Sequence, residues 1–240
     1  MGDYSQAAEF YDVLYSGQKD YGAEVDRLAD WIRAGSPTAT SVLDVGCGTG
    51  VHARCLIDAG FSVDGVDLEP AFVEIASAKC PEANFSVGDM RTLDLSNRYD
   101  AVVCLFSAIG YVRDEAALFG TIARMAAHRE PGGVVLVDPW FEPGDLADGW
   151  ISTTVGRGDG VTVYRMSRTV LIGSASRLEF EYLIGTAEGI ERRSEVHEPG
   201  VFTQDEMEAS FRAAGLTVER LPKLVRTRGI YVGRGTRDPL

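Results

Sequence analysis

The sequence predicts an α/β protein in which a mostly parallel sheet, covered by helices, carries an inserted antiparallel layer of strands. Three observations predict this fold. Strand-like and helical segments alternate between about residues 37 and 140. The strand-like runs are nearly continuous in Val and Leu, as in "GGVVLVDPW", which is typical of strands buried on both faces. After Trp140 the helices stop, and strand-like segments follow one another across Gly-rich turns.

The first part of the chain supplies the parallel sheet and its helices. A helix is expected from about residue 21, where Val25, Leu28 and Ile32 recur at helical spacing until a Gly-Ser-Pro run ends it. Gly60 ends the helix "TGVHARCLIDAG", and Pro70 opens the helix "PAFVEIASAKC". A further helix is "DEAALFGTIARMAAH". The expected strands are "SVLDVG", "SVDGVDL", "NFSVGDM", "YDAVVCLFS" and "GGVVLVDPW".

The second part supplies the inserted layer and then returns to the first fold. Roughly four antiparallel strands are expected, because strand-like runs are separated only by turns. They are "WISTTVGR", "VTVYRMSRTVLI", "SRLEFEYLIG" and "GIERRSEVHE". A helix begins at Thr203, which forms a capping box with Glu206, and Gly215 ends it. "LTVERL" and "GIYVGRG" are expected to close the chain as an antiparallel pair.

Composition and charge disfavour several classes of protein. The 240 residues are 45% apolar and 25% charged, which is ordinary for a folded domain. A net charge of −13 disfavours binding to nucleic acid or to an anionic membrane, so neither partner is expected. The first residues do not match a signal peptide or a myristoylation site, and no apolar run is long enough for a transmembrane helix. Four cysteines without C-x-x-C spacing indicate free thiols, so a cytoplasmic protein with no metal site is expected.

The stretch "VLDVGCGTG" at residues 42–50 predicts a ligand-binding turn. A strand is followed by Gly46, Gly48 and Gly50 and then by a helix, so bare backbone lies at a helix N-terminus. The alternative is a merely tight strand-to-helix turn. A nicotinamide site would need G-x-G-x-x-G, but Val51 stands at the third glycine position.

With Asp44 two residues before the first glycine, the loop resembles motif I of the class I S-adenosylmethionine-dependent methyltransferases. These have a Rossmann-like sheet whose last strand is antiparallel. Asp67, "GDM" and Leu105 end the second, third and fourth strands, where the family has its cofactor contacts. The resemblance implies S-adenosyl-L-methionine as cofactor, held by Tyr11, Asp44, Gly46, Gly48, Gly50, Asp67, Leu68, Asp89, Met90 and Leu105.

Some of these residues also have structural explanations. Asp67 would serve equally as a helix N-cap, and Asp89 as a turn residue that caps its own backbone. Met90 and Leu105 are as well explained by packing as by contact with a ligand.

A closer resemblance extends over nearly the whole chain. "DYSQAAEFYDVLYSGQKDY", "GDMRTLDL", "FSAIGYV", "DPWFEPGDLADGW", "VHEPGVFT" and "TRGIYVG" are similar to the aminosugar N,N-dimethyltransferases, which act on dTDP-linked amino-deoxyhexoses for antibiotics such as macrolides. The resemblance implies a homodimer that transfers two methyl groups in succession to one sugar amine. It implies N-terminal lid helices in residues 1–36, a cofactor-binding α/β domain in 37–140 and 201–240, and the inserted layer in 141–200. Gly46, Asp67 and Asp138 depart mildly from the family, where Ala, Glu and Glu are expected. "VHEPGVFT" lacks the more basic and aliphatic run expected there, and Tyr111 stands where some members have His. These departures bear on the identity of the sugar rather than on the cofactor.

The same resemblance assigns residues to the sugar. Tyr4 and Tyr111 match positions at the sugar-amine site, where a phenol accepts from or orients the amine, and they are the catalytic candidates. A nucleotide sugar also needs cations for its diphosphate and an aromatic surface for its base. Candidates in the more basic C-terminal part and beside the inserted layer are Arg165, Arg168, Arg177, Arg228, Trp140, Phe141 and Trp150. The substrate-binding residues expected are Tyr21, Trp140, Phe141, Arg168 and Arg228, with Arg228 the first choice for the diphosphate or sugar. The alternatives are that the tyrosines staple a terminal helix and that the arginines are simply solvated.

The chemistry depends mainly on placement. Methyl transfer from a sulfonium to an amine is an in-line displacement, for which orientation supplies much of the rate. A strong protein base is not required if the sugar ammonium loses its proton to water. The chain has three histidines, none with an evident partner in the sequence. His52 follows the glycine loop and could touch the cofactor, but it is expected on a helix surface.

Three rival functions remain open at this point. One is a methyltransferase of another small-molecule amine or hydroxyl. Another is a cofactor-binding partner subunit without turnover. A nicotinamide oxidoreductase ranks last, because its glycine pattern is missing.

Overall fold

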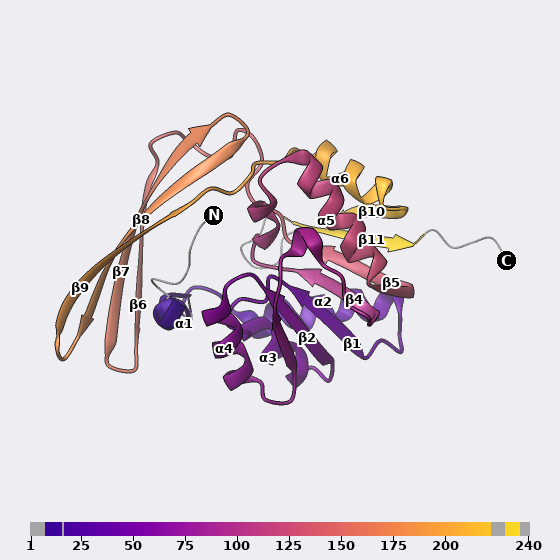
Figure 1. The fold of residues 1–240 in the computed structure, drawn as a ribbon, viewed down its shortest axis with the longest axis horizontal. Helices are drawn as coiled ribbons and strands as arrows, with labels where there is room; N and C mark the ends of the chain where they lie inside the picture. The colour runs from indigo at the N-terminus through magenta and orange to yellow at the C-terminus, as the bar shows by residue number, and fades with distance from the viewer. Residues whose placement is uncertain (1–7, 16, 222–228, 236–240) are drawn as a thin grey trace.

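The computed structural model describes residues 8–15, 17–221 and 229–235, and this part of the chain forms two sheets (Figure 1). The larger sheet has seven strands in the order β10-β11-β5-β4-β1-β2-β3. Its strands are β1 (Ser41–Val45), β2 (Ser62–Asp67), β3 (Asn84–Val87), β4 (Tyr99–Cys104), β5 (Arg129–Val137), β10 (Leu216–Leu221) and β11 (Ile230–Gly235). The first five run parallel, while β11 is antiparallel to both β5 and β10. The predicted fold class is confirmed.

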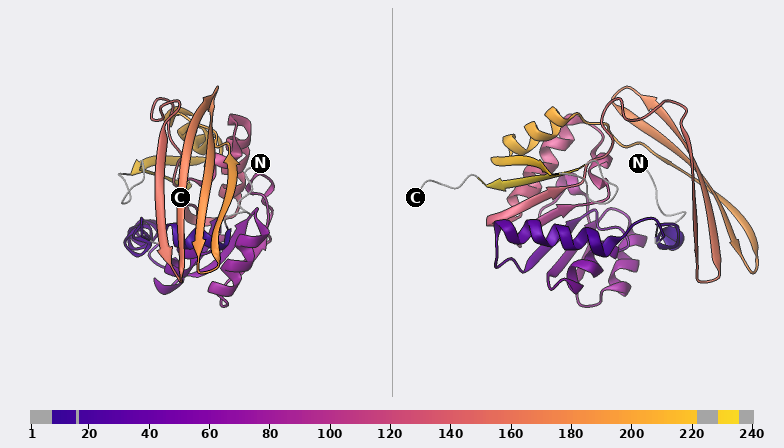
Figure 2. Two further views of the ribbon diagram at one scale, coloured as in Figure 1. Left: turned by 90° about the vertical axis from the view of Figure 1, so that its left-hand side faces the viewer. Right: turned by 180° about the vertical axis from the view of Figure 1, so that it is seen from behind.

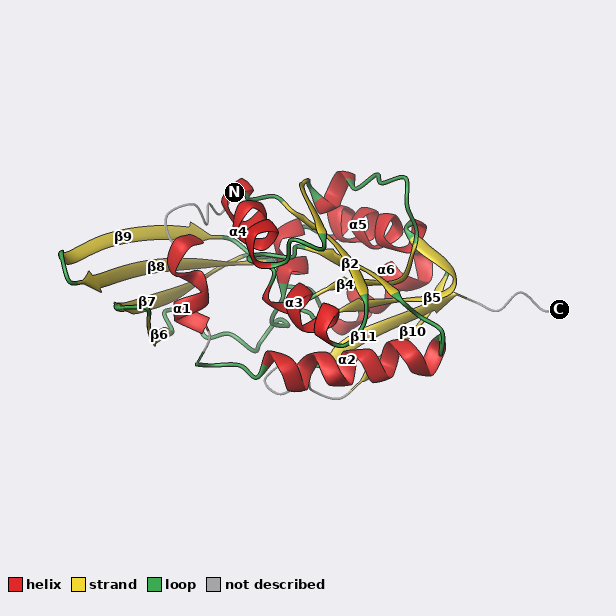
Figure 3. Cartoon of the chain, turned by 90° about the horizontal axis from the view of Figure 1, so that it is seen from below, coloured by secondary structure: helices red, strands yellow, loops and turns green. Residues whose placement is uncertain are grey.

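Helices cover both faces of the large sheet (Figure 3). One face packs on α2 (Tyr21–Gly35) and α3 (Val51–Asp58), and the other on α5 (Glu115–Ala127) and α6 (Gln204–Ala213). Neighbouring strand residues such as Val102 and Val103 face opposite layers and are both fully buried. This double burial is the reason that the strands read as continuous apolar runs rather than alternating ones.

The predicted helix ends are also confirmed. Thr203 and Glu206 form both halves of the capping box of α6. Pro70 opens α4 (Pro70–Lys79), whose N-cap is Glu69, so Asp67 is not the cap of that helix. Gly60 takes a positive φ of 91° after the end of α3.

The inserted layer is a four-stranded antiparallel sheet in the order β6-β7-β8-β9, and it projects from the main body (Figure 2). Its strands are β6 (Ile151–Gly158), β7 (Val161–Ile172), β8 (Ala175–Thr186) and β9 (Gly189–His197). Along β8 burial alternates: Leu178, Phe180, Tyr182 and Ile184 are buried, and the residues between them are more exposed. One face is therefore an inner face toward the rest of the chain, and the other is an outer face toward solvent.

A short N-terminal segment lies between the two sheets (Figure 1). It consists of a 3₁₀ turn, η2 (Ala8–Phe10), and the helix α1 (Tyr11–Tyr15), which packs on β6 and β7 through the buried Leu14. The longer helix α2 packs instead on the large sheet. The lid expected in residues 1–36 stays a prediction; of its described elements, η2 and α1 lie beside the inserted sheet and α2 lies against the large sheet.

Candidate active site

A cavity of about 550 Å³ opens at the carboxyl ends of the parallel strands. The chain builds β2 and β3 on one side of β1 and then crosses to β4 on the other side, and ligands of open α/β sheets collect at such a reversal. The cavity is within the size range of small-molecule sites. It is lined by Tyr11, Gly46, Gly48, Val66, Asp67, Leu68, Glu69, Phe72, Gly88, Asp89, Met90, Arg91, Leu105, Phe106, Ala108, Tyr111, Arg113 and Glu198.

The glycine loop forms one wall of this cavity. Gly46 and Gly48 have φ angles of +76° and +54°, which side-chain-bearing residues adopt at a cost. A Cβ at Gly48 would meet nothing within 4 Å, so the backbone there faces open space. The loop therefore presents bare main chain to whatever occupies the cavity.

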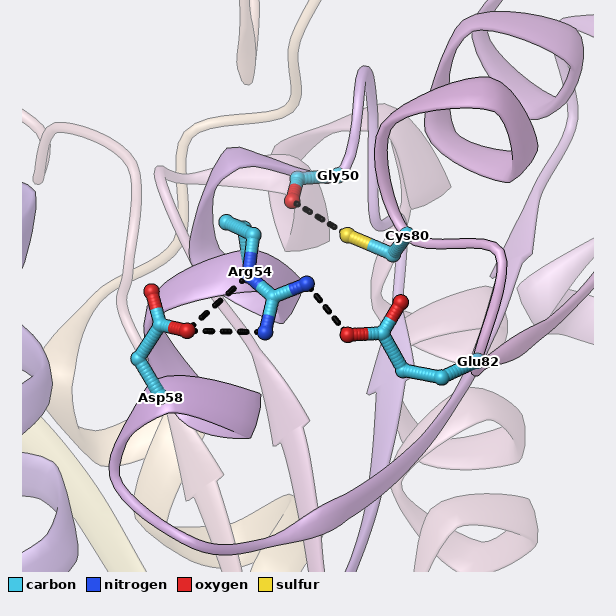
Figure 4. A network of polar contacts seen from close by, with 5 residues as sticks. All are labelled: Gly50, Arg54, Asp58, Cys80 and Glu82. Carbon is cyan, nitrogen blue, oxygen red and sulfur yellow. Dashed lines mark hydrogen bonds and ion pairs between the residues drawn. The ribbon is translucent and has the colours of Figure 1, made fainter.

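Polar contacts hold the helix that follows the loop in place (Figure 4). Arg54 on α3 bonds to Asp58 on the same helix and to Glu82 beyond α4. The Cys80 thiol donates to the carbonyl oxygen of Gly50 at 3.8 Å. Gly50 does not line the cavity; it is the N-cap of α3, with a φ of 76°.

Asp44 is a buried carboxyl beside the loop. Its side chain lies at the end of β1 and is almost fully buried, and its Oδ2 has no hydrogen-bond partner among the described residues. Burial, together with the charge of Asp67, raises the pKa of this carboxyl to about 7, against the opposing effect of Lys19. An unmatched buried carboxyl of this kind is expected where a cationic group binds.

Asp67 and Asp89 both line the cavity and both bond to nearby backbone. Asp67 accepts from the N–H groups of Gly48 and Glu69 at 2.8 and 2.9 Å, although burial raises its pKa. Asp89 accepts from the N–H of Arg91 and pairs with the Arg91 guanidinium, which lowers the pKa of the carboxyl. Asp89 thus caps its own turn, as the structural explanation expects, and it also lines the cavity.

A second cavity of about 310 Å³ lies between the two sheets. Tyr11, Phe106 and Tyr111 line both cavities and so form the junction between them. The wall contains Trp140 and Phe141, as expected, and the inner face of β7 adds Arg165. Its lining residues are Tyr11, Tyr15, Gln18, Lys19, Phe106, Ser107, Tyr111, Asp138, Trp140, Phe141, Leu146, Trp150, Ser152, Arg165, Ser167, Thr169, Leu178, Phe180 and Pro199.

Aromatic contacts place α1 over the junction. The ring of Tyr11 packs edge-on against Phe72 on α4 at 5.1 Å, and Tyr15 packs against Phe106 at 5.1 Å. Arg165 donates to the Tyr15 hydroxyl at 2.5 Å. This segment therefore contacts the glycine-loop side and the inserted sheet at the same time.

An ion pair fastens the same helix to the glycine loop. Lys79 Nζ lies 2.6 Å from Asp12 Oδ2 and 2.7 Å from the carbonyl oxygen of Thr49. The hydroxyl of Thr49 also donates to Asp12. Asp12, Lys79 and Thr49 therefore connect α1 to the glycine loop and α4.

His52 does not lie on a helix surface, and that expectation is wrong. The side chain is buried on the inner side of α3, with Nε2 3.1 Å from Glu24 and 3.2 Å from Lys19. Burial lowers the pKa of His52, whereas the pKa of Glu24 is lowered by His52 and Lys19 in spite of burial. Lys19 Nζ also lies 4.4 Å above the Phe106 ring at the junction.

The structure does not bring every candidate to the two cavities, and the predicted cofactor residues Asp44 and Gly50 line neither of them. Tyr4 and Arg228 lie outside the described residues. Tyr21 packs against His52 at 4.9 Å and lines neither cavity. Arg168 lies on the outer face of β7, where it pairs with Glu179. Arg165, three residues earlier, is on the inner face instead.

The chain is similar to known methyltransferases over most of its length. Residues 42–133 match the family model described as "Methyltransferase domain". The chain is 41% identical over 228 residues, 94% of this chain and 96% of the relative, to a dTDP-3-amino-3,4,6-trideoxy-alpha-D-glucopyranose N,N-dimethyltransferase of Streptomyces venezuelae. It is also 41% identical over 236 residues, 97% of this chain and 92% of the relative, to a dTDP-3-amino-3,6-dideoxy-alpha-D-glucopyranose N,N-dimethyltransferase of Streptomyces fradiae.

A solved structure with S-adenosylmethionine bound is similar as well. It is that of CalS10, an amino pentose methyltransferase of Micromonospora echinaspora, with a TM-score of 0.85 and 38% identity, and the match covers 94% of this chain and 96% of that one. Within residues 8–15, 17–221 and 229–235, no helix has the length and apolarity needed to span a bilayer. The same part of the chain contains no cluster of three or more His, Cys, Asp or Glu side chains suited to a metal ion.

Proposed function

This chain belongs to the dTDP-aminosugar N,N-dimethyltransferases, a family that uses S-adenosyl-L-methionine, and we propose that it methylates the amine of a dTDP-linked amino-deoxyhexose twice in succession. The product would be a dimethylamino sugar for an antibiotic. The observation that carries the proposal is the junction: a nucleoside-sized cavity and a second, aromatic cavity meet at Tyr11, Phe106 and Tyr111.

The residues of the first cavity fit the cofactor. The backbone at Gly48 faces open space, and Asp44 Oδ2, buried next to the loop outside the lining of the cavity, has no partner among the residues described. Asp67 and Leu68 would hold the ribose, and Asp89 and Met90 the adenine, while Tyr11, Asp44 and the loop glycines would hold the amino-acid end. When bound, S-adenosylmethionine supplies a methyl group activated by the positive charge of its sulfur.

The residues at the junction would position the amine and keep water out. Tyr111 lines both cavities, so its hydroxyl can accept an N–H of an amine held in the second one. The rings of Tyr11, Tyr15 and Phe106 enclose the space around that point. Orientation of this kind can supply about 7–11 kcal/mol of rate enhancement in well-aligned cases. We retain Tyr4 as a second candidate at the amine.

The second cavity would hold the sugar and part of its nucleotide. Trp140 and Phe141 pack edge-on at 4.8 Å and offer apolar surface, and Arg165 brings a positive charge to the same wall. A diphosphate needs such a cation. Arg165 is thus a stronger candidate for the diphosphate than Arg168, and Arg228 remains a proposal from the family pattern. Tyr21 would act only through the Lys19 and His52 cluster that it covers.

Mass spectrometry tests the proposal directly. The protein is incubated with S-adenosylmethionine and, separately, with dTDP-3-amino-3,4,6-trideoxyglucose, dTDP-3-amino-3,6-dideoxyglucose and a dTDP-4-amino isomer. We expect one and then two added methyl groups on at least one of these sugars, and none without the cofactor. Absence of methylation on all isomers would refute the proposal. In that case, the absence of a thermal shift with dTDP would indicate a methyltransferase of another small molecule. Binding of S-adenosylhomocysteine without turnover would indicate a partner subunit.

We further propose a homodimer formed through the outer face of the inserted sheet. That face exposes a set of apolar side chains that are 39–79% accessible: Ile151, Val155, Tyr164, Met166, Leu183, Ile190 and Val196. An apolar surface of this extent is typical of an interface between protein chains. Light scattering should give twice the chain mass for the wild type and for Glu188→Lys at the β8–β9 turn. It should give a monomer for Met166→Glu combined with Leu183→Glu; a wild-type monomer would contradict the proposal.

The thiols fit the compartment that we propose. All four cysteines are free, as is usual in the reducing cytoplasm, where this chain would meet its cofactor and nucleotide sugar.

A further inference from the structure

Two residues adopt an unfavourable backbone conformation at the junction of the two cavities. Phe106 and Ser107, between the end of β4 and the 3₁₀ segment η4 (Ala108–Val112), have φ angles of +52° and +63°. Residues that carry a side chain adopt such angles at a cost, and they are concentrated at functional sites. Phe106 lines both cavities, Ser107 lines the second and Ala108 lines the first. Ser107 therefore lies where the two cavities meet.

The side chain of Ser107 does not play the usual part of a serine at this position. Ser107 is the N-cap of η4, where a serine hydroxyl commonly accepts a hydrogen bond from the backbone of the first turn. The Ser107 side chain forms no such cap. Its hydroxyl donates instead to the carbonyl oxygen of Pro139 at 2.8 Å. The start of η4 therefore does not explain why a serine is held in this conformation.

The bond to Pro139 fixes the polarity of the Ser107 hydroxyl. The backbone N–H of Asp138 donates to the carbonyl oxygen of Cys104 at 2.9 Å, but Pro139 has no N–H with which to continue this pairing. Its carbonyl oxygen accepts from Ser107, and within the described ranges this is the only hydrogen bond of the Ser107 hydroxyl. A hydroxyl has one proton and two acceptor lone pairs. With its proton held by Pro139, the Ser107 oxygen can only accept.

Resting on the proposed function, we propose that the Ser107 oxygen accepts an N–H of the sugar amine and thereby leaves the amine lone pair directed at the methyl group. An amine bound to Ser107 lies at the meeting point of the two cavities, where the transfer must take place. A hydroxyl that was free to donate would instead bond to the lone pair, which is the electron pair that the reaction needs. The Pro139 carbonyl prevents this by holding the only proton of the hydroxyl.

An acceptor of this kind is suited to two successive transfers. In each transfer the nitrogen lone pair forms the new N–C bond, the C–S bond breaks with its electron pair left on sulfur, and the resulting ammonium loses a proton to water. A primary amine has two N–H groups and the secondary amine has one, so both can bond to Ser107. The tertiary amine has none. Ser107 would therefore orient the amine for both methylations but would not hold the dimethylated product.

The test compares Ser107→Ala and Ser107→Gly with the control Ser77→Ala on α4. Ser77 is matched, because its hydroxyl also donates to a backbone carbonyl at 2.8 Å, that of Val73, and it lines neither cavity. For each variant kcat and KM are measured with the primary and with the monomethylated dTDP-aminosugar. We expect kcat to fall about 10- to 100-fold on both substrates in the two Ser107 variants, because small misplacements of reacting atoms have effects of this size. Ser77→Ala should keep the wild-type values.

The two Ser107 variants separate the hydroxyl from the stability of the fold. Ser107→Ala loses the bond to Pro139 and keeps a side chain at a positive φ, so its Tm should fall. Ser107→Gly loses the same bond but relieves the backbone, so its Tm should be higher than that of Ser107→Ala. Similar losses of kcat at different stabilities would assign the effect to the hydroxyl. If Ser107→Ala does not fold, Ser107→Gly decides by the same kinetic and binding criteria.

Calorimetry in the presence of S-adenosylhomocysteine gives a readout that does not depend on turnover. Ser107→Ala should bind the dTDP-aminosugar several-fold more weakly than the wild type does, but it should bind dTDP with unchanged affinity, because only the amine contacts Ser107. Wild-type kcat in Ser107→Ala, or equal losses of affinity for dTDP and for the dTDP-aminosugar, would overturn the proposal. A wild-type protein that methylates no dTDP-aminosugar would instead refute the proposed function.

Discussion

Replacing Asp44 by Asn should make the protein more stable and a poorer cofactor binder. The substitution keeps the size of the side chain and removes its charge. Burial beside Asp67 raises the pKa of Asp44 from 3.8 to about 7, so the folded chain holds this proton more tightly than the unfolded chain does. The stabilising effect of that proton is complete below about pH 4 and is lost as the pH rises toward 7. Above pH 7 the ionised carboxylate destabilises the fold by the full amount.

The size of the effect follows from the shift. At about 1.4 kcal/mol per pKa unit, the three units give an upper bound of about 4 kcal/mol. Because the Asn amide must also be accommodated, we expect Asp44→Asn to raise the free energy of unfolding by about 2–4 kcal/mol above pH 7 and by almost nothing near pH 4. In a chain of this size that corresponds to a rise in Tm of roughly 4–16 °C at pH 8. S-adenosylhomocysteine should bind about 10- to 100-fold more weakly, as expected for loss of one charge-assisted hydrogen bond.

The assays are thermal unfolding at pH 4, 6 and 8 and calorimetric titration with S-adenosylhomocysteine. Asp58→Asn is the matched control, since Asp58 is exposed and paired only with Arg54, and neither its Tm nor its affinity should change appreciably. The reasoning fails if Asp44→Asn melts below the wild type at pH 8. It also fails if the difference in Tm is the same at all three pH values.

Three further substitutions test other parts of the site and fold. Lys79→Met removes the ion pair to Asp12; because both groups are partly exposed, we expect a loss of stability below about 1 kcal/mol, but several-fold weaker S-adenosylhomocysteine binding by calorimetry. Gly50→Ala places a Cβ 2.9 Å from that of Ala76 at a φ of 76°, so denaturant unfolding should show a loss of about 1–3 kcal/mol. Thr203→Ala removes the capping-box hydroxyl of α6 and should cost about 1 kcal/mol by the same measurement with unchanged cofactor affinity. Unchanged affinity in Lys79→Met, or unchanged stability in either of the other two, would contradict these assignments.

Local signals predicted the fold well because they act over a few residues. Pro70 and the Thr203 box fix helix starts, and continuous Val and Leu runs reflect burial on both faces. The carboxyl ends of parallel strands must meet at one edge, which is why the cavity wall at Asp67 and Leu105 could be located from the sequence.

Contacts between distant segments were not accessible in the same way. His52 looked like a surface residue because its partners Lys19 and Glu24 lie about thirty positions away in the chain, in a segment whose packing the helical pattern does not reveal. The pairing of Tyr111 with His197 depends on how the inserted sheet docks on the α/β domain, which no periodicity encodes.

The choice between two arginines of β7 needed the structure. Val163 and Thr169 are buried on the inner face, and residues at even spacing from them share it, so Arg165 is on that face and Arg168 on the outer one. In "VTVYRMSRTVLI" the outer positions are at least as apolar as the inner ones, so the sequence pattern alone does not identify the inner face.

The region of the glycine loop combines two features that cost stability. Asp44 is buried with an unmatched oxygen, and Gly46 and Gly48 adopt conformations that favour glycine. The cost of burying a carboxylate is compensated at Glu24. This side chain is equally buried, but it pairs with Lys19 and His52. Because the unmatched oxygen of Asp44 lies beside the glycine loop, next to the proposed cofactor site, we expect the missing cation to arrive with the cofactor. Cofactor binding and folding stability should therefore be coupled through Asp44.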